Sequence, residues 1–207
     1  MPVEEVAVGG VRLRLGRPAD PESLLREEAF ADESLLPYWA ELWPSGRLLA
    51  EWVAKSPSVP GRRVLELGAG LGLPSLVAAA RGAEVVANDW SAPAVRCLRA
   101  NAARNGLALR VLRADWGQPE ALLASAPFDL VLAADVLYER RAVRQLLALV
   151  PKLLGNRAEL WLADPGRPRT LEFLAALAAR GFASRCLARR REVSVLTLSA
   201  RGAEPRA

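Results

Sequence analysis

The chain has 207 residues, a net charge of +5 and no histidine. The lack of histidine excludes imidazole general-base catalysis, the commonest nucleophilic triads and most zinc sites, and we predict no metal centre. The positive charge comes almost entirely from arginine, in a chain rich in alanine, leucine, glycine and proline. A nucleic-acid partner is therefore not expected from the charge.

Length and apolar content predict one domain over residues 1–207. Hydrophobic residues make up 52% of the chain, which is enough to bury one substantial core. No apolar run reaches the length of a membrane span, and the opening stretch MPVEEVAVGG is acidic where a targeting peptide would be basic. We expect a soluble, cytoplasmic protein with no membrane partner.

Residues 1–60 predict a small N-terminal extension. The stretch EEVAVGGVRLRLGRP predicts a hairpin that turns at Gly9 and Gly10. A polar helix is expected next, followed by the aromatic stretch PYWAELWPSGRLLAEWVA.

Residues 61–207 alternate apolar runs of strand length with segments of helical period, which predicts a mostly parallel sheet covered on both faces. The expected strands are 63–67, 84–89, 108–115, 128–135 and 158–164, and the expected helices lie near 73–81, 92–104, 118–125, 140–153 and 169–180. After Gly181, the runs FASRCLA and EVSVLTLS are joined by a charged arginine turn and predict a hairpin. The fold class is α/β: a doubly wound, Rossmann-like sheet of seven strands that ends in an antiparallel hairpin, as in the methyltransferase variant of this fold.

A glycine-rich loop follows the first core strand. Its pattern is Glu66, Gly68, Gly70 and Gly72, whereas a dinucleotide fingerprint needs its third glycine at Leu73. Glu66 places a carboxylate where a pyrophosphate would otherwise lie. That carboxylate repels a dinucleotide but attracts the ammonium and sulfonium groups of S-adenosylmethionine (SAM), so the loop favours SAM as cofactor.

Acidic and aromatic residues end the next two strands. Asp89 is expected to accept hydrogen bonds from both ribose hydroxyls, and Asp115 to accept one from the adenine amino group. Trp116 is expected to stack on the adenine ring, and Trp90 either covers the ribose or adenine or packs on the following helix. The carboxyl ends of consecutive parallel strands lie at one edge of the sheet, so these residues predict one pocket.

The motif at the end of the fourth strand indicates the methyl acceptor. DNA-adenine and glutamine methyltransferases of this fold carry an Asn-Pro-Pro-Tyr type motif there, whose carbonyls suit a planar amino group. This chain has Asp135, Val136, Leu137 and Tyr138 instead. A carboxylate suits a cationic amine through charge-assisted hydrogen bonds, so Asp135 and Tyr138 are the predicted catalytic residues.

Several motifs together resemble the family 16 seven-strand methyltransferases, which include many protein-lysine methyltransferases. They are YWAELWPSG, LELGAGLGLPSL, NDW, ADW and AADVLYE; PYWAELWPSG and DPGRP are most similar to the electron transfer flavoprotein beta-subunit lysine methyltransferases. The resemblance places Trp43 over the methionine end of SAM, Asp135 beside the transferable methyl, and Asp164 and Arg167 at the substrate. Arg167 is expected at the rim, where it would pair with an acidic group of a partner.

The resemblance implies a SAM-dependent methyltransferase that modifies a lysine ε-amine of a protein substrate, possibly the electron transfer flavoprotein beta subunit. The main alternative is a small-molecule N-methyltransferase with a nicotinamide-like acceptor. RNA methylation and a module that only binds a partner are weaker alternatives, since no RNA-binding motif accompanies the arginines and the acidic series is intact.

Overall fold

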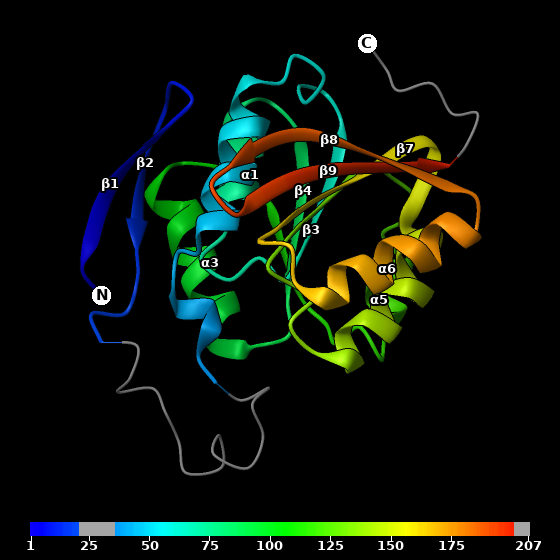
Figure 1. Ribbon diagram of the computed structural model, residues 1–207. Coiled ribbons are helices and arrows are strands. Elements are labelled where there is room, and N and C mark those ends of the chain that lie inside the picture. The colour runs from blue at the N-terminus through cyan, green and yellow to red at the C-terminus, as the bar shows by residue number, and fades with distance from the viewer. Residues whose placement is uncertain (21–35, 201–207) are drawn as a thin grey trace.

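The computed structural model describes residues 1–20 and 36–200. They form a central seven-stranded sheet with helices on both faces and a separate two-stranded sheet at the N-terminus (Figure 1). The polar helix expected between the hairpin and the aromatic stretch falls mainly on residues 21–35, which lie outside the described residues.

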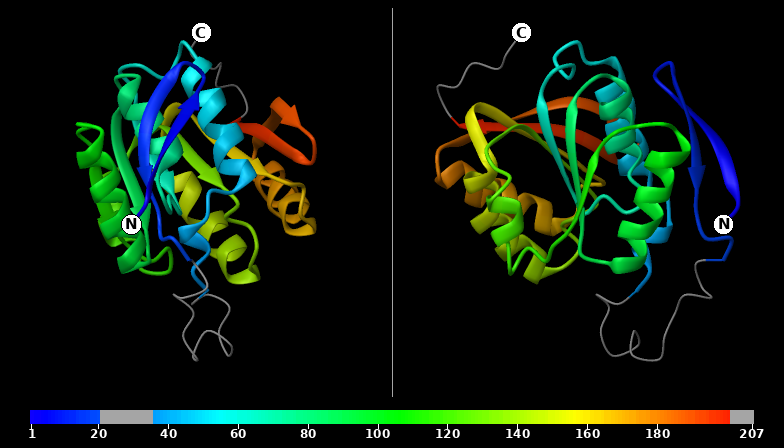
Figure 2. Two further views of the ribbon diagram at one scale, coloured as in Figure 1. Left: turned by 90° about the vertical axis from the view of Figure 1, so that its left-hand side faces the viewer. Right: turned by 180° about the vertical axis from the view of Figure 1, so that it is seen from behind.

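The N-terminal hairpin forms as predicted. Strands β1 (Val3–Val8) and β2 (Val11–Gly16) pair antiparallel around Gly9 and Gly10, both of which have positive φ. A two-residue turn with positive φ at both positions matches the right-handed twist of the strands it joins. The Asn101 side chain fixes the hairpin to helix α3, because it accepts from the Gly16 N–H at 2.8 Å and donates to the Gly16 carbonyl at 3.0 Å. The hairpin therefore lies beside the helical layer and outside the main sheet (Figures 1 and 2).

The main sheet has the strand order β5-β4-β3-β6-β7-β9-β8. Its strands are β3 (Arg63–Leu67), β4 (Glu84–Asp89), β5 (Arg110–Arg113), β6 (Phe128–Ala134), β7 (Leu154–Asp164), β8 (Phe182–Arg190) and β9 (Val193–Ala200). Strands β3 to β7 are parallel, whereas β9 pairs antiparallel with both β7 and β8. The predicted fold class, with its terminal hairpin, is confirmed. The chain order reverses beside β3, and its carboxyl end is therefore where a ligand is expected.

Helices cover both faces of the sheet (Figure 2). They are α1 (Pro44–Lys55), α2 (Leu73–Ala80), α3 (Ala92–Arg104), α4 (Glu120–Leu123), α5 (Arg140–Leu153) and α6 (Pro168–Ala179), with a short 3-10 turn, η4 (Tyr38–Ala40), before α1. Leu49 of α1 and Leu76 of α2 pack in one apolar cluster with the hairpin, whereas Leu146 of α5 and Phe173 of α6 pack in the cluster on the opposite face. None of the helices in residues 1–20 and 36–200 combines the length and apolar character needed to cross a membrane.

Most predicted boundaries hold, and the differences have simple causes. Strand β5 is shorter than the expected 108–115, and α4 is a single turn inside the expected 118–125. Strand β7 begins directly after α5, four residues earlier than expected. The arginine run was expected as a turn, but most of it is strand, because β8 and β9 stay paired as far as Arg190 and Val193. Of the three arginines, Arg191 lies in the turn, with positive φ.

A buried polar network joins the middle of the sheet to its last hairpin. Arg62, just before β3, forms an ion pair of 3.2 Å with Glu159 of β7, and both side chains are almost fully buried. Thr197 of β9 donates to the second oxygen of Glu159 at 3.0 Å. In β9, Thr197 is flanked by Leu196 and Leu198, and Thr197 is the register partner of Trp161 on β7.

Candidate active site

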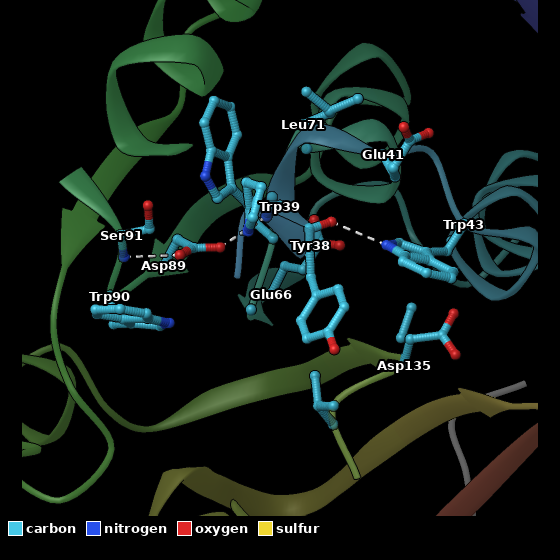
Figure 3. A pocket seen from close by; sticks show the side chains of 18 of the residues that line it. Tyr38, Trp39, Glu41, Trp43, Glu66, Leu71, Asp89, Trp90, Ser91 and Asp135 are labelled. Carbon is cyan, nitrogen blue, oxygen red and sulfur yellow. Dashed lines mark hydrogen bonds between the residues drawn. The ribbon is translucent and has the colours of Figure 1, made fainter. Parts of the chain in front are cut away.

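A cavity of about 1050 Å³ opens at the carboxyl ends of β3, β4 and β6 (Figure 3). Its walls come from the glycine loop, the segment around η4, the N-terminus of α3 and the loop after β6. Eleven of the predicted site residues line it: Trp43, Glu66, Gly68, Gly70, Gly72, Asp89, Trp90, Trp116, Asp135, Tyr138 and Arg167. One cavity therefore gathers most of the residues that the sequence assigned to cofactor and acceptor.

The glycine loop allows a close approach of the N-terminal segment. Gly70 has φ +54, and a Cβ atom there would lie 3.1 Å from the Trp39 carbonyl oxygen. At Gly72, with φ +82, a Cβ atom would overlap Leu98 of α3. Side chains are disfavoured at both positions by the backbone conformation as well as by space. The glycines thus let the loop turn from β3 into α2 while the η4 segment lies against it.

Glu66 is buried and held by the first turn of α2. One of its carboxylate oxygens accepts from the Ser75 backbone N–H at 2.8 Å and also from the Ser75 hydroxyl. Burial raises the pKa of Glu66 to about 8, against the lowering effect of the two Ser75 hydrogen bonds. In the ligand-free protein the group is therefore mostly protonated at neutral pH, and a cation placed beside it would favour the carboxylate.

Asp89 is also buried, and its carboxylate is oriented by backbone donors. Gly70 N–H donates to Oδ2 at 2.9 Å and Ser91 N–H donates to Oδ1 at 2.9 Å (Figure 3). Burial raises the pKa of Asp89, and these backbone hydrogen bonds oppose the rise. Each carboxylate oxygen keeps a further acceptor site, so this orientation suits a ligand with two neighbouring hydroxyls.

Two indole rings line the part of the cavity beside Asp89. Trp116 donates from Nε1 to the Asn88 side-chain oxygen at 2.9 Å, and its ring lies over Gly68, whose Cβ would be 3.4 Å away. Trp90 is 42% exposed, and its ring lies along the cavity beyond Asp89 (Figure 3). This exposure leaves Trp90 available to cover a ligand.

Asp135 lies just after β6 with positive φ (57°), which is uncommon for a residue with a side chain. Its N–H donates to the Ala163 carbonyl at 3.0 Å. Its Oδ1 pairs with Arg167 at 2.7 Å, and Arg167 also pairs with Asp164 at 2.9 Å. The structure thus gives Arg167 two carboxylate partners within its own chain, where the sequence predicted an acidic group of a partner.

Aromatic rings form the wall near Asp135. Tyr38 makes edge contacts with Trp43 at 6.1 Å and with Tyr138 at 5.4 Å between ring centroids. Trp43 donates from Nε1 to the Tyr38 carbonyl at 2.9 Å, which fixes the indole beside η4 (Figure 3). Burial, followed by the nearby charge of Glu139, raises the pKa of Tyr138 to about 12, so its hydroxyl stays protonated at neutral pH.

Two predicted site residues do not line the cavity. Asp115 turns away, because Arg141 of α5 pairs with its Oδ2 at 2.9 Å and Gly117 N–H donates to Oδ1. Asp164 is 2% exposed, and its carboxylate caps the loop that leads into α6. In the ligand-free protein both carboxylates are held by groups of their own surroundings, and their contacts with adenine and acceptor stay predictions.

Three contributors to the site were not singled out from the sequence. Tyr38 and the Trp39 backbone approach the cavity because η4 folds onto the glycine loop, a contact between segments thirty residues apart. Ser75 lies in the first turn of α2, where its N–H has no partner within the helix. A hydroxyl residue in that turn, nine positions after a buried strand-end glutamate, is the signal that would have identified Ser75.

Comparison with known proteins places the chain in a family. A family model described as lysine methyltransferase matches residues 32–178, which include the glycine loop, Asp89, Asp135 and Arg167. The chain belongs to the lysine methyltransferase family. Membership confirms the predicted family.

The curated relatives of this chain include proteins named as arginine methyltransferases and proteins named as lysine methyltransferases. This chain is 36% identical over 128 residues to the histone-arginine methyltransferase METTL23 of Homo sapiens, and the match covers 58% of this chain and 67% of that protein. It is 30% identical over 142 residues to the electron transfer flavoprotein beta subunit lysine methyltransferase of Mus musculus, covering 64% of this chain and 52% of that protein. The match therefore spans about half to two thirds of these relatives' lengths.

Solved structures share the fold of this lysine methyltransferase family member. The Thermus thermophilus 16S rRNA N2 G1207 methyltransferase (RsmC), solved with AdoMet and guanosine, superposes with a TM-score of 0.72 at 22% identity. The superposition covers 97% of this chain and 50% of that chain. At this identity the likeness supports the fold alone.

The residues that line the cavity fit SAM as a ligand. Glu66 and Asp89 offer two buried carboxylates to a cationic ligand that carries a ribose, and Trp90 and Trp116 offer ring faces to its base. A pyrophosphate would meet the acidic side chain of Glu66 at a loop position where phosphate-binding folds direct N–H donors at the anion. Among the described residues, no cluster of cysteine, aspartate and glutamate is arranged to hold a metal ion.

Proposed function

We propose that this protein transfers a methyl group from SAM to a lysine ε-amine on a folded protein. The observation that carries the proposal is the position of Asp135 and Tyr138, which line the same cavity as the glycine loop and Asp89. A carboxylate and aromatic rings at the acceptor end suit an amine on an apolar stem better than a planar amide or base.

Residues at one end of the cavity would hold the cofactor. Asp89 would accept from the ribose hydroxyls, Glu66 would face the cationic amino-acid end, and Trp116 would cover the base. When bound, SAM supplies an electrophilic methyl group on a positively charged sulfur. The protein's own task is then to bind the acceptor nearby, to align its nitrogen and to exclude water.

Residues at the other end would hold the acceptor. Asp135 would accept a hydrogen bond from the amine, and the rings of Tyr38, Trp43 and Tyr138 would surround the lysine stem. A free lysine has a pKa of about 10.4, so its nitrogen must lose a proton before it can react. With Tyr138 protonated and histidine absent, we infer that this proton leaves to solvent.

The substrate protein is proposed from the relatives' names and the sequence motifs. The electron transfer flavoprotein beta subunit is the first candidate, because relatives from Mus musculus and Danio rerio carry that substrate in their names. A translation component is the second. A cytoplasmic location is proposed with it, and a nucleic-acid acceptor is not, since the arginines form no aromatic-basic motif.

A protein arginine is a second candidate acceptor. It is favoured by one observation: relatives from Homo sapiens, Xenopus laevis and Mus musculus are named histone-arginine methyltransferases. No comparable observation favours a nicotinamide-like small molecule.

The direct test incubates the enzyme and SAM with the purified flavoprotein and separately with a lysate of a strain that lacks the gene. Mass spectrometry should find lysines heavier by multiples of one methyl group. Asp135→Asn should abolish most of this transfer while SAM still binds in calorimetry. Label found only on arginine, or only on small molecules, would overturn the lysine assignment.

A further inference from the structure

Three charged groups form a compact cluster at the acceptor end of the cavity. Nη1 of Arg167 lies 2.7 Å from Oδ1 of Asp135 and 2.9 Å from Oδ2 of Asp164. The side chains of Arg167, Asp135 and Asp164 are 28%, 12% and 2% exposed, so the cluster is fixed at its base and reaches the cavity at its tip.

Asp164 gives the cluster a rigid base. Its Oδ1 accepts from Gly166 N–H at 2.8 Å, from Arg167 N–H at 2.9 Å and from the Thr170 hydroxyl at 2.6 Å. Two of the donors belong to the loop before α6, and Thr170 lies in the first turn of that helix. The guanidinium of Arg167 is therefore held by a carboxylate that cannot move without breaking the start of a helix.

Asp135 is left with one free acceptor oxygen. Oδ1 is taken by Arg167, whereas Oδ2 is buried and has no hydrogen-bond partner among residues 1–20 and 36–200. A buried carboxylate oxygen without a donor costs free energy, and a ligand that brings an N–H group would remove that cost. Asp135 lines the cavity, so the amine of the proposed lysine acceptor could be that ligand once it displaces the atoms that cover Oδ2.

Charge decides what state that amine can adopt. A carboxylate beside a lysine stabilises the ammonium form, which has no lone pair to react, and two carboxylates stabilise it more strongly. Arg167 cancels one of the two negative charges of Asp135 and Asp164. With Arg167 in place, an amine can be held by Oδ2 and still give up its proton.

We propose that Arg167 is a positioning residue: it orients Asp135 so that Oδ2 receives the acceptor amine, and its charge allows that amine to deprotonate. The proposal rests on the proposed lysine acceptor. It assigns Arg167 a task inside the site, in place of the predicted contact with an acidic partner.

Other ionisable groups also line the cavity and must be kept constant in a test. They are Tyr38 of η4, Glu41 after it, Glu66 of β3, Asp89 of β4, Arg96 of α3, Arg113 of β5 and Tyr138 before α5. Each of them is present in both the wild type and an Arg167 variant. The ratio of the two rates at each pH therefore isolates the effect of Arg167.

The test compares Arg167→Gln with Arg167→Lys and with Arg180→Gln, which removes the same charge from the opposite end of α6. Labelled SAM and lysate proteins of a strain lacking the gene serve as substrates from pH 7 to 10, and methyl-lysine is counted after hydrolysis. A charge at this range shifts a titration by about 1 to 2 pH units, so Arg167→Gln should lose about 10- to 100-fold near pH 7.5. The loss should shrink steadily toward pH 10.

Arg167→Lys should keep the wild-type pH profile, and Arg180→Gln should match the wild type throughout. Calorimetry should find SAM affinity unchanged in Arg167→Gln, which separates this role from loss of the fold. A deficit that is equal at every pH would overturn the proposal while the lysine function stands. Wild-type enzyme that labels no lysine at any pH would overturn the proposed function and this inference together.

Discussion

The buried carboxyl group of Glu66 should make the stability of the ligand-free protein depend on pH. Burial raises the pKa of Glu66 from its ordinary value of 4.5 to about 8. Between these two pH values the folded state holds a proton that the unfolded state has released. The free energy of unfolding therefore falls as pH rises from about 4.5 to about 8.

The size of the effect follows from the two pKa values. At about 1.4 kcal/mol for each pH unit, the rise corresponds to an upper limit of about 5 kcal/mol. Glu66→Gln keeps the shape of the side chain and an oxygen that can accept from Ser75, but it cannot ionise. The variant should therefore gain stability over the wild type as pH increases, up to a few kcal/mol at pH 8.5.

The assay is urea unfolding of the wild type and of Glu66→Gln at several pH values from 5 to 9. Glu84→Gln is the control, because Glu84 lies at the exposed start of β4 and its carboxylate makes a long contact of 3.8 Å with Arg63. Its curve should run parallel to that of the wild type. Parallel curves for Glu66→Gln as well would refute the claim that Glu66 is protonated in the folded protein.

The same group should couple SAM binding to proton release. A cation beside Glu66 favours the carboxylate, so binding near pH 7 should release up to about one proton. Calorimetry in two buffers of different ionisation enthalpy measures that number. Glu66→Gln should release almost none and should bind SAM more weakly; equal proton release in both proteins would show that the cation binds elsewhere.

Three further changes test other parts of the site. Asp89→Asn should weaken SAM binding by about 10- to 100-fold in calorimetry, because it loses a charge-assisted acceptor for the ribose, and an unchanged affinity would remove Asp89 from that role. Gly70→Ala should lower stability by about 1 to 3 kcal/mol in thermal unfolding, since its φ of +54 and the Trp39 carbonyl both oppose a side chain; a neutral result would mean that the η4 segment does not lie on the loop. Tyr138→Phe should leave the alkaline side of the pH–rate profile unchanged below about pH 10, because the pKa of Tyr138 is about 12, and a shifted profile would contradict that value.

The strands and helices of the main sheet were predicted well, because the signals that define each of them lie within its own segment of the sequence. The strands at 63–67 and 84–89 and the helices at 92–104 and 140–153 have the predicted bounds, since apolar periodicity and capping residues act within each segment. The short elements β5 and α4 were overestimated. Their residues carry the right pattern, but their lengths depend on pairing with β4 and on packing against α5.

The site was predicted less completely, because side-chain direction is set by distant partners. Asp115 was expected at a strand end but lies two residues beyond β5, where Arg141 pairs with its carboxylate. Asp164 ends its strand as predicted, but Arg167 N–H and the Thr170 hydroxyl at the start of α6 hold its carboxylate in a buried position. Nothing in the local pattern distinguishes these two acids from Asp89, which keeps its place because the Gly70 and Ser91 N–H groups face it.

The network of Arg62, Glu159 and Thr197 has a consequence for how the chain avoids misfolding. Strand β9 lies between β7 and the edge strand β8 and pairs antiparallel with β7, and a slip by one residue would exchange the two faces of the strand. Such a slip would bring Leu196 or Leu198 to the place of Thr197 and leave the buried carboxylate of Glu159 short of a donor. A hairpin of β8 and β9 in the wrong register is therefore less stable even without a ligand. These two strands should pair in a single register beside β7, the strand that ends at Asp164.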